Sequence, residues 1–133
     1  MKLHKGFTVI EILIVVAILA FASILFFTQK SNVSASARDE ARKTSVNSIY
    51  HTLESVYYPQ HHSYPRTISE KTLPTINPDL LKDPDGTLIG DGKSQFRYEP
   101  FNCTDDTTCE GYTLRAILEK EGDFVKKNKK TNA

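Results

Sequence analysis

Apolar residues follow two different patterns in the N-terminal part of the chain. Residues 7–27 are almost continuously apolar, and Glu11 is the single ionisable residue among them. Farther along, apolar residues recur every three to five positions, as on one face of a helix. These positions are Val33, Ala37, Ala41, Val46, Ile49, Leu53 and Val56. The pattern predicts one helix over residues 7–57, about 75 Å long, which ends there because Pro59 disfavours helix at the preceding residue.

The C-terminal part of the chain has the pattern of loops and short strands. Residues 60–92 contain four prolines and little alternation, which predicts an irregular segment. The runs 95–101 and 112–119 alternate apolar and polar residues, which predicts two strands. Pro100 lacks an N–H donor and therefore predicts a bulge or an edge position for the first strand. Residues 120–133 have no such alternation, so a final turn and a disordered basic tail are expected there.

The two cysteines, Cys103 and Cys109, lie between the predicted strands. A close pair of cysteines in an oxidising compartment tends to form a disulfide, so we predict a bonded hairpin rather than two free thiols. With the cysteines facing each other, Tyr98 lies opposite Leu114 and Phe96 opposite Ala116, and their apolar face can cover the helix. The same register places Arg97 opposite Arg115, a like-charge pair that counts against it.

Residues 7–27 are long enough to cross a membrane as a helix, since about 20 residues span a hydrocarbon core. Lys2 and Lys5 precede this segment, so the positive-inside bias predicts a cytoplasmic N-terminus and an extracytoplasmic remainder. A secretory signal peptide cut after Ala22 is the alternative. It accounts poorly for Glu11, because an intramembrane carboxylate costs about 2.5–3.5 kcal/mol and usually has a partner.

The length, the net charge and the absence of catalytic motifs argue against several classes of protein function. The 133 residues leave room for one small domain beside the apolar segment. The net charge of +1 is not the basic footprint of a dedicated nucleic-acid binder, so nucleic-acid binding is not favoured, though it is left open. The chain has no nucleophile elbow, phosphate loop or helical pair of metal ligands. A non-enzymatic protein is therefore expected.

Two groups of residues contain side chains that can bind metal ions, but neither group has the spacing of a known metal-binding motif. His51, His61 and His62 have no cysteine or acid at ligand spacing, so we interpret them as solvated side chains. Asp83, Asp85 and Asp91 offer oxygen ligands for Ca²⁺, but the calcium-loop spacing is not met. A tight turn over residues 83–86 is favoured, since Asp83 can accept backbone hydrogen bonds and Gly86 tolerates positive φ.

The stretch KGFTVIEILIVVAILA at residues 5–20 resembles the class III signal of type IV prepilins and pseudopilins. The match includes the short basic leader, Gly6, Phe7, Glu11 and the unbroken apolar run. In that family a membrane peptidase cuts after the glycine and methylates the new amine. The resemblance therefore implies cleavage between Gly6 and Phe7, N-methylation of Phe7, and the prepilin peptidase and assembly platform as partners.

The same resemblance implies a partner for Glu11. In filaments of this family the glutamate is thought to attract the N-terminal amine of a neighbouring subunit, which for this chain is the amine of Phe7. Such a pair sets the axial register between subunits, and apolar surroundings strengthen it. The alternative for Glu11 is a local role at the helix N-terminus, where a negative charge is favourable.

We thus expect an α+β, pilin-like fold, with a long, partly transmembrane N-terminal helix packed on a small antiparallel sheet. The expected parts are a leader (1–6), a transmembrane and assembly helix (7–28), its amphipathic continuation (29–58), and a loop plus small β domain with a basic tail (59–133). The expected function is a subunit of a homo-oligomeric or mixed filament, held in the inner membrane before assembly and extracellular afterwards. The alternative is a single-pass or secreted binding module that does not assemble.

Overall fold

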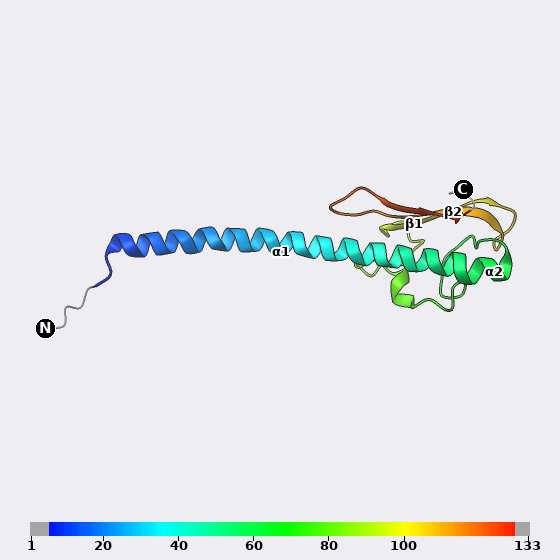
Figure 1. Cartoon of the computed structure of the whole chain (residues 1–133), viewed down its shortest axis with the longest axis horizontal. Helices are drawn as coiled ribbons and strands as arrows, with labels where there is room; N and C mark the ends of the chain where they lie inside the picture. Colours follow the sequence, from blue (N-terminus) through cyan, green and yellow to red (C-terminus); the bar gives the residue numbers. More distant parts are fainter. Residues whose placement is uncertain (1–5, 130–133) are drawn as a thin grey trace. The chain divides into compact units, whose positions relative to one another are not determined.

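The structure, a computed structural model, describes residues 6–129, without the side chains of residues 31 and 32. Residues 1–5 and 130–133 lie outside it, and with them most of the predicted leader and the end of the predicted basic tail. The chain divides into two units, Met1–Ala35 and Ser36–Ala133. Figure 1 shows the long helix α1 (Val9–Thr52) and, in the second unit, the sheet beside the C-terminal part of the helix.

The helical run ends later than the sequence predicts. After α1, a π-helical turn η1 (Leu53–Tyr57) leads into the short helix α2 (Tyr58–His61). In η1 the Tyr58 N–H donates to the carbonyl oxygen of Leu53, so the wider turn changes the pairing just before Pro59. A residue without an N–H can then follow without breaking the run. The predicted break at Pro59 is therefore wrong: the run ends at His61, and the next residue, His62, has a left-handed backbone conformation.

The predicted hairpin register is confirmed, but both strands extend farther toward the turn than predicted, and the second strand ends earlier, at Ala116. Strands β1 (Phe96–Cys103) and β2 (Cys109–Ala116) pair antiparallel, with Phe96 opposite Ala116, Tyr98 opposite Leu114 and Cys103 opposite Cys109. Cys103 and Cys109 form a disulfide. In the sheet order β1-β2-β3, β1 is an edge strand and pairs with β2 alone. Pro100, which lacks a backbone N–H, therefore lies in a strand that has no second neighbouring strand to which that N–H would donate.

The like-charge pair of Arg97 and Arg115 is present, but each guanidinium has its own oxygen partners. Arg97 donates to the carbonyl oxygen of Gly92 at 3.1 Å. Arg115 lies 3.8 Å from a carboxylate oxygen of Glu99 and 3.9 Å from one of Asp123. These oxygens offset the repulsion that counted against the register.

A third strand, β3 (Phe124–Lys127), pairs antiparallel with β2. The sequence analysis placed these residues in a final turn and disordered tail, and for residues 124–127 that prediction is wrong. Four residues are too few to show alternation, and two of the four are lysines. Backbone pairing with β2 and the half-buried ring of Phe124 stabilise the strand instead.

The core of the second unit lies between the C-terminal part of the helix and the sheet. Val46, Ile49 and Leu53 are fully buried, as the helix pattern predicts. Val33, Ala37 and Ala41 are exposed, and Asp39 and Arg42 are buried in that part of the helix instead. The predicted apolar stripe is therefore correct only from Val46 onward.

The segment between α2 and β1 is mostly irregular, as predicted, apart from the 3-10 helix η2 (Pro78–Leu81). It nevertheless contributes to the core through the buried side chains of Tyr64, Ile68, Leu73, Ile76, Leu81 and Ile89. The predicted turn over residues 83–86 is confirmed: the Gly86 N–H donates to the carbonyl oxygen of Asp83 at 2.7 Å, and Gly86 has φ of 85°.

Candidate functional site

The N-terminal motif lies at the start of α1, with its predicted cleavage point outside the helix. Gly6, Phe7 and Thr8 have no regular secondary structure, and all three are exposed. The carbonyl oxygen of Thr8 accepts hydrogen bonds from the N–H groups of Glu11 (3.1 Å) and Ile12 (3.2 Å). The Thr8 hydroxyl oxygen also accepts from the Glu11 N–H at 3.3 Å, as in an N-cap. The Gly6–Phe7 peptide bond is thus accessible, immediately before a capped helix.

Glu11 lies in the first turn of α1. A carboxylate there is favourable beside the partial positive charge of the helix N-terminus, so the local role predicted for Glu11 is compatible with its position. The side chain is exposed and leaves its oxygens accessible to a further partner. Whether a neighbour's amine is that partner stays a prediction.

The apolar side chains that follow the motif are exposed on every side of the helix. The large apolar residues between Phe7 and Phe27 are 50–77% exposed, with Phe7 itself at 76%. The helical run Val9–His61 contains a stretch long and apolar enough to cross a membrane. A helix that is apolar all round is stable only where lipid or other helices cover it. The first unit therefore has the surface of a membrane or assembly helix.

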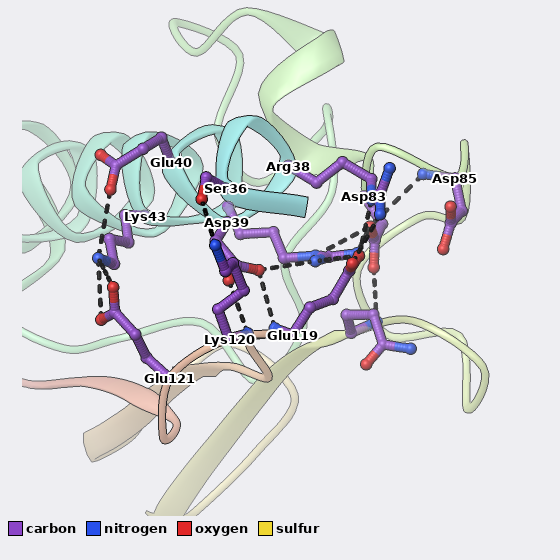
Figure 2. Close-up of polar contacts among 12 residues, drawn as sticks. Ser36, Arg38, Asp39, Glu40, Lys43, Asp83, Asp85, Glu119, Lys120 and Glu121 are labelled. Atoms are coloured by element: carbon purple, nitrogen blue, oxygen red, sulfur yellow. Dashed lines mark hydrogen bonds and ion pairs between the residues drawn. The ribbon is translucent and has the colours of Figure 1, made fainter. Parts of the chain in front are cut away.

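The second unit contains a buried ionic cluster centred on Arg42, whose side chain is 2% exposed. The guanidinium donates to carboxylate oxygens of Asp39 at 3.1 Å, Glu119 at 3.0 Å and Asp83 at 3.3 Å. Figure 2 shows these three carboxylates converging from separate segments. Arg42 therefore joins α1 to the 83–86 turn and to the segment after β2.

The carboxylates of the Arg42 cluster also hold backbone groups. Asp39 accepts hydrogen bonds from the N–H groups of Glu119 (2.8 Å) and Lys120 (3.0 Å). Burial acts to raise the pKa of Asp39, but these N–H donors and Arg42 outweigh it and lower that pKa. Hydrogen bonds from Arg38 and then Arg42 lower the pKa of Glu119 to about 2. The surroundings of Asp39 and Glu119 thus favour the ionised form of both carboxylates.

The three aspartates considered as calcium ligands, Asp83, Asp85 and Asp91, do not form one group. Asp83 is buried and bonds to Arg42, and its other oxygen accepts from the Gln95 N–H at 2.9 Å. Asp91 bonds to the Lys93 N–H at 3.0 Å, within a separate turn. Over the described residues 6–129, no three His, Cys, Asp or Glu side chains are grouped so that they could hold a metal ion.

The histidines lie on the helical run rather than in a loop. His51 belongs to α1 and His61 to α2, and His62 is the residue that ends α2. The His61 ring stacks on Tyr57 with ring centroids 4.1 Å apart. All three side chains are exposed, and His51 lies within the predicted helix, whereas His61 lies in α2 and not in the irregular segment predicted from residue 60.

A second buried polar group surrounds Glu54 in η1. One Glu54 oxygen accepts from the Tyr112 hydroxyl at 2.9 Å, and both accept from the Tyr64 hydroxyl at 3.1 Å. Burial, and then the hydrogen bond to Glu54, raise the pKa of Tyr112 well above its usual value. Glu54 therefore links the helix to the segment after α2 and to β2.

Sequence reasoning missed Asp39, Arg42, Glu54 and Glu119. Asp39, Arg42 and Glu54 lie on the helical run, and Glu119 follows β2. No motif distinguishes any of them from the exposed charged residues of the chain. The one usable signal was spacing: Asp39, Arg42, Val46, Ile49 and Leu53 follow each other at intervals of three or four, on one helix face. Burying charged residues is costly without partners, so the spacing alone did not favour it.

A family model described as the prokaryotic N-terminal methylation motif matches residues 1–27. No curated protein and no solved structure matches the chain significantly. The matched residues include Gly6, Phe7 and Glu11, together with the exposed apolar segment. The remainder of the chain supplies the other half of a pilin-like fold, a long helix packed against an antiparallel sheet. Residues 1–27 therefore carry the prokaryotic N-terminal methylation motif, which is similar to the class III signal of type IV prepilins and pseudopilins.

Proposed function

We propose that the chain is a structural, non-catalytic subunit of a type IV pilus-like filament. One observation carries the proposal: the methylation motif continues into a helix whose apolar side chains are uncovered on every side. Such a surface needs lipid before assembly and neighbouring helices afterwards. The compact second unit, with its own core, supplies the part of the subunit that remains in water.

In this proposal the prepilin peptidase cuts after Gly6 and methylates the amine of Phe7. The accessible position of the Gly6–Phe7 bond, outside the helix, supports this step. An added Cβ at Gly6 would meet no atom within 4 Å, so the glycine is not needed for the fold of the chain itself. Its purpose is then to fit a peptidase subsite that accepts no side chain.

Cleavage creates a positive amine at Phe7, one helical turn before Glu11. Both charges then lie at the edge of an apolar segment, where an unpaired charge is costly. Pairing the amine of one subunit with Glu11 of the next satisfies both charges and sets the register of the two helices. In a medium of low dielectric constant a wrong register would leave two charges unpaired.

Before assembly, the subunit spans the inner membrane once, with its leader in the cytoplasm and residues 59–133 outside. The lysines of the leader support this orientation. The partners are copies of the same chain or sister pilins, the prepilin peptidase and the assembly platform. After assembly, the subunit is part of an extracellular or cell-surface filament.

Intact-mass analysis of the membrane-extracted chain tests the proposal. We expect a mature chain that begins at Phe7 and is heavier by one methyl group. A chain beginning at Ser23 would indicate a secreted module, and an intact leader would indicate a plain membrane anchor. Either result contradicts the proposal.

A pair of glycine variants makes this test specific. Gly6→Val should leave an uncut precursor in the membrane. Gly92→Val is the matched control, because Gly92 also lies in open space and has no positive φ, yet it is outside the motif. Normal maturation of both variants would remove Gly6 from the proposed cleavage site.

A further inference from the structure

A pocket of about 530 Å³ opens at the disulfide end of the hairpin. It is lined by four segments that are distant in sequence: residues 62–63 after α2, the end of β1, the start of β2, and Asn128 after β3. The volume lies within the range of about 300–1,000 Å³ typical of small-molecule sites. Backbone pairing of Tyr64 with Cys109 brings the first segment to the hairpin. The pocket is thus a product of the tertiary fold.

One wall of the pocket is formed by Phe101, whose aromatic ring lies close to Gly111 of the neighbouring strand. Phe101 lies opposite Gly111 in the β1–β2 register. A Cβ added at Gly111 would lie 2.3 Å from the Phe101 ring and 2.7 Å from the Asn128 side-chain oxygen. The absence of a side chain at Gly111 therefore lets the ring lie across the sheet. Phe101 is nevertheless 38% exposed, and it is one of the residues that line the pocket.

The other walls are polar and rich in groups that both donate and accept hydrogen bonds. Asn102 donates to a carboxylate oxygen of Glu110 at 3.0 Å, which orients the two side chains. Ser63, Thr104 and Thr108 contribute hydroxyl-bearing residues to the lining. Amides and hydroxyls can pair with a ligand that carries both donors and acceptors, whereas a carboxylate only accepts.

The backbone around the pocket is held in an uncommon conformation. His62 and Asn102, with φ of 55° and 51°, are the only non-glycine residues with positive φ in residues 6–129, and both line this pocket. Such conformations persist where surrounding structure enforces them, and they gather at ligand sites. The disulfide between Cys103 and Cys109 and the pairing of Tyr64 with Cys109 supply that structure.

From these four features we infer that the pocket binds a neutral saccharide. A sugar ring presents a face of C–H groups, which the negative face of an aromatic ring attracts, and an edge of hydroxyls that donate and accept. Glu110 disfavours an anionic ligand by repulsion. A purely apolar ligand would remove the exposed side chains of Asn102 and Glu110 from water without replacing the hydrogen bonds that water makes to them. The inference holds whether or not the chain assembles into filaments.

Saturation-transfer NMR on the full mature chain tests this site. The chain is held in micelles of a zwitterionic detergent without sugar, and lactose, cellobiose, maltose and N,N′-diacetylchitobiose are added in turn. We expect transfer to the C–H protons of at least one disaccharide. Phe101→Ala should weaken its binding about tenfold or more, equivalent to at least about 1.4 kcal/mol, and Glu110→Gln should weaken it as well.

Ile117→Ala is the matched control, because Ile117 is 37% exposed but does not line the pocket. It should bind the sugar as the wild type does. Tyrosine near-UV circular dichroism verifies that each variant is folded. If Phe101→Ala is not folded, the comparison of Glu110→Gln with the wild type tests the site instead. A second arm uses mixed micelles containing a lipid-linked form of each disaccharide, which distinguishes a glycolipid headgroup from a free sugar. No transfer in either arm, or equal binding by the pocket variants and Ile117→Ala, overturns the inference.

Discussion

Residues 9–30 and residues 36–61 are both helical, yet they present opposite surfaces. The first stretch exposes its large apolar side chains on every side and carries one carboxylate, Glu11. The second buries a narrow stripe that includes Ile49 and Leu53, and also buries the charges of Arg42 and Glu54 with partners. The first stretch therefore has its interactions outside the chain, and the second has them within it. Substitutions in the first should change assembly, and substitutions in the second should change stability.

The largest effect expected is the loss of filaments in Glu11→Val. The variant should insert into the membrane at least as well as the wild type, because it removes a charge that is costly to insert. It should also be cut after Gly6. Filaments should fall at least tenfold while membrane monomer accumulates, because the incoming amine of Phe7 has no counter-charge. Immunoblots of sheared filament and membrane fractions measure both pools.

The control for Glu11→Val is Glu70→Val, the same change at an exposed position of the second unit. It should assemble normally. Tyrosine circular dichroism should show the same unfolding curve for Glu11→Val as for the wild type, since all six tyrosines lie in the second unit. Wild-type filament yield from Glu11→Val would mean that Glu11 does not set the register.

The next effect concerns Arg42→Ala, which should lower the free energy of unfolding of the second unit by about 3–5 kcal/mol. Removing one partner of a buried ionic cluster leaves the remaining charges uncompensated. Here the carboxylates of Asp39 and Asp83 would lose their buried cation. Urea unfolding in detergent, followed by tyrosine circular dichroism, measures the loss.

Arg38→Ala is the control for the Arg42 variant, because Arg38 donates to the same Glu119 from a side chain that is 40% exposed. Its loss should have a much smaller effect, as is usual for surface ion pairs. Equal destabilisation by the two variants would show that burial of the Arg42 side chain does not determine the loss of unfolding free energy.

A smaller effect is expected from Cys103→Ser with Cys109→Ser. The chain-entropy model assigns about 2 kcal/mol to a disulfide that closes so short a loop. The unfolding midpoint in urea should fall accordingly, and membrane insertion should not change. Alkylation of the unreduced wild-type chain should detect no free thiol. Detection of a labelled thiol would contradict the prediction, because it would show that Cys103 and Cys109 are not bonded in the native protein.

The smallest effect is the acid dependence due to Glu119. Because its pKa in the folded chain is about 2 rather than the usual 4.5, the unfolded chain binds more protons between these pH values. The contribution of Glu119 to stability is therefore complete above about pH 4.5 and is lost as the pH falls toward 2. Glu119→Gln should flatten the plot of unfolding free energy against pH in this range. An unchanged slope would contradict the pairing with Arg38 and Arg42.

Much of the fold followed from local patterns that need no tertiary information. The hairpin register was predictable because the alternation of Phe96 and Tyr98 with charged residues has a period of two, and the cysteines leave one way to align it. The start of α1 was predictable to within two residues from the motif. The predicted helix end failed because a π turn before Pro59 depends on how Glu54 and Tyr57 are buried, which propensity does not encode.

Irregular and short segments were the least predictable parts of the second unit. Strand β3 has four residues, and its pairing with β2 rather than its own pattern makes it a strand. The segment between α2 and β1 reads as loop, yet it contributes Tyr64 and Leu73 to the core. Tertiary contacts outweigh local preference in both cases.

The sequence by itself determined the part of this protein that acts between molecules. The motif of Gly6, Phe7 and Glu11 and the apolar run after it form one continuous segment. They can therefore be recognised from the sequence without knowledge of the tertiary structure. Only the tertiary structure decided which charges are buried and where a pocket forms. The Arg42 cluster and the Phe101 pocket each combine residues tens of positions apart. Whether a charged side chain is solvated or buried depends on the partners that folding brings to it, and no local pattern specifies those partners.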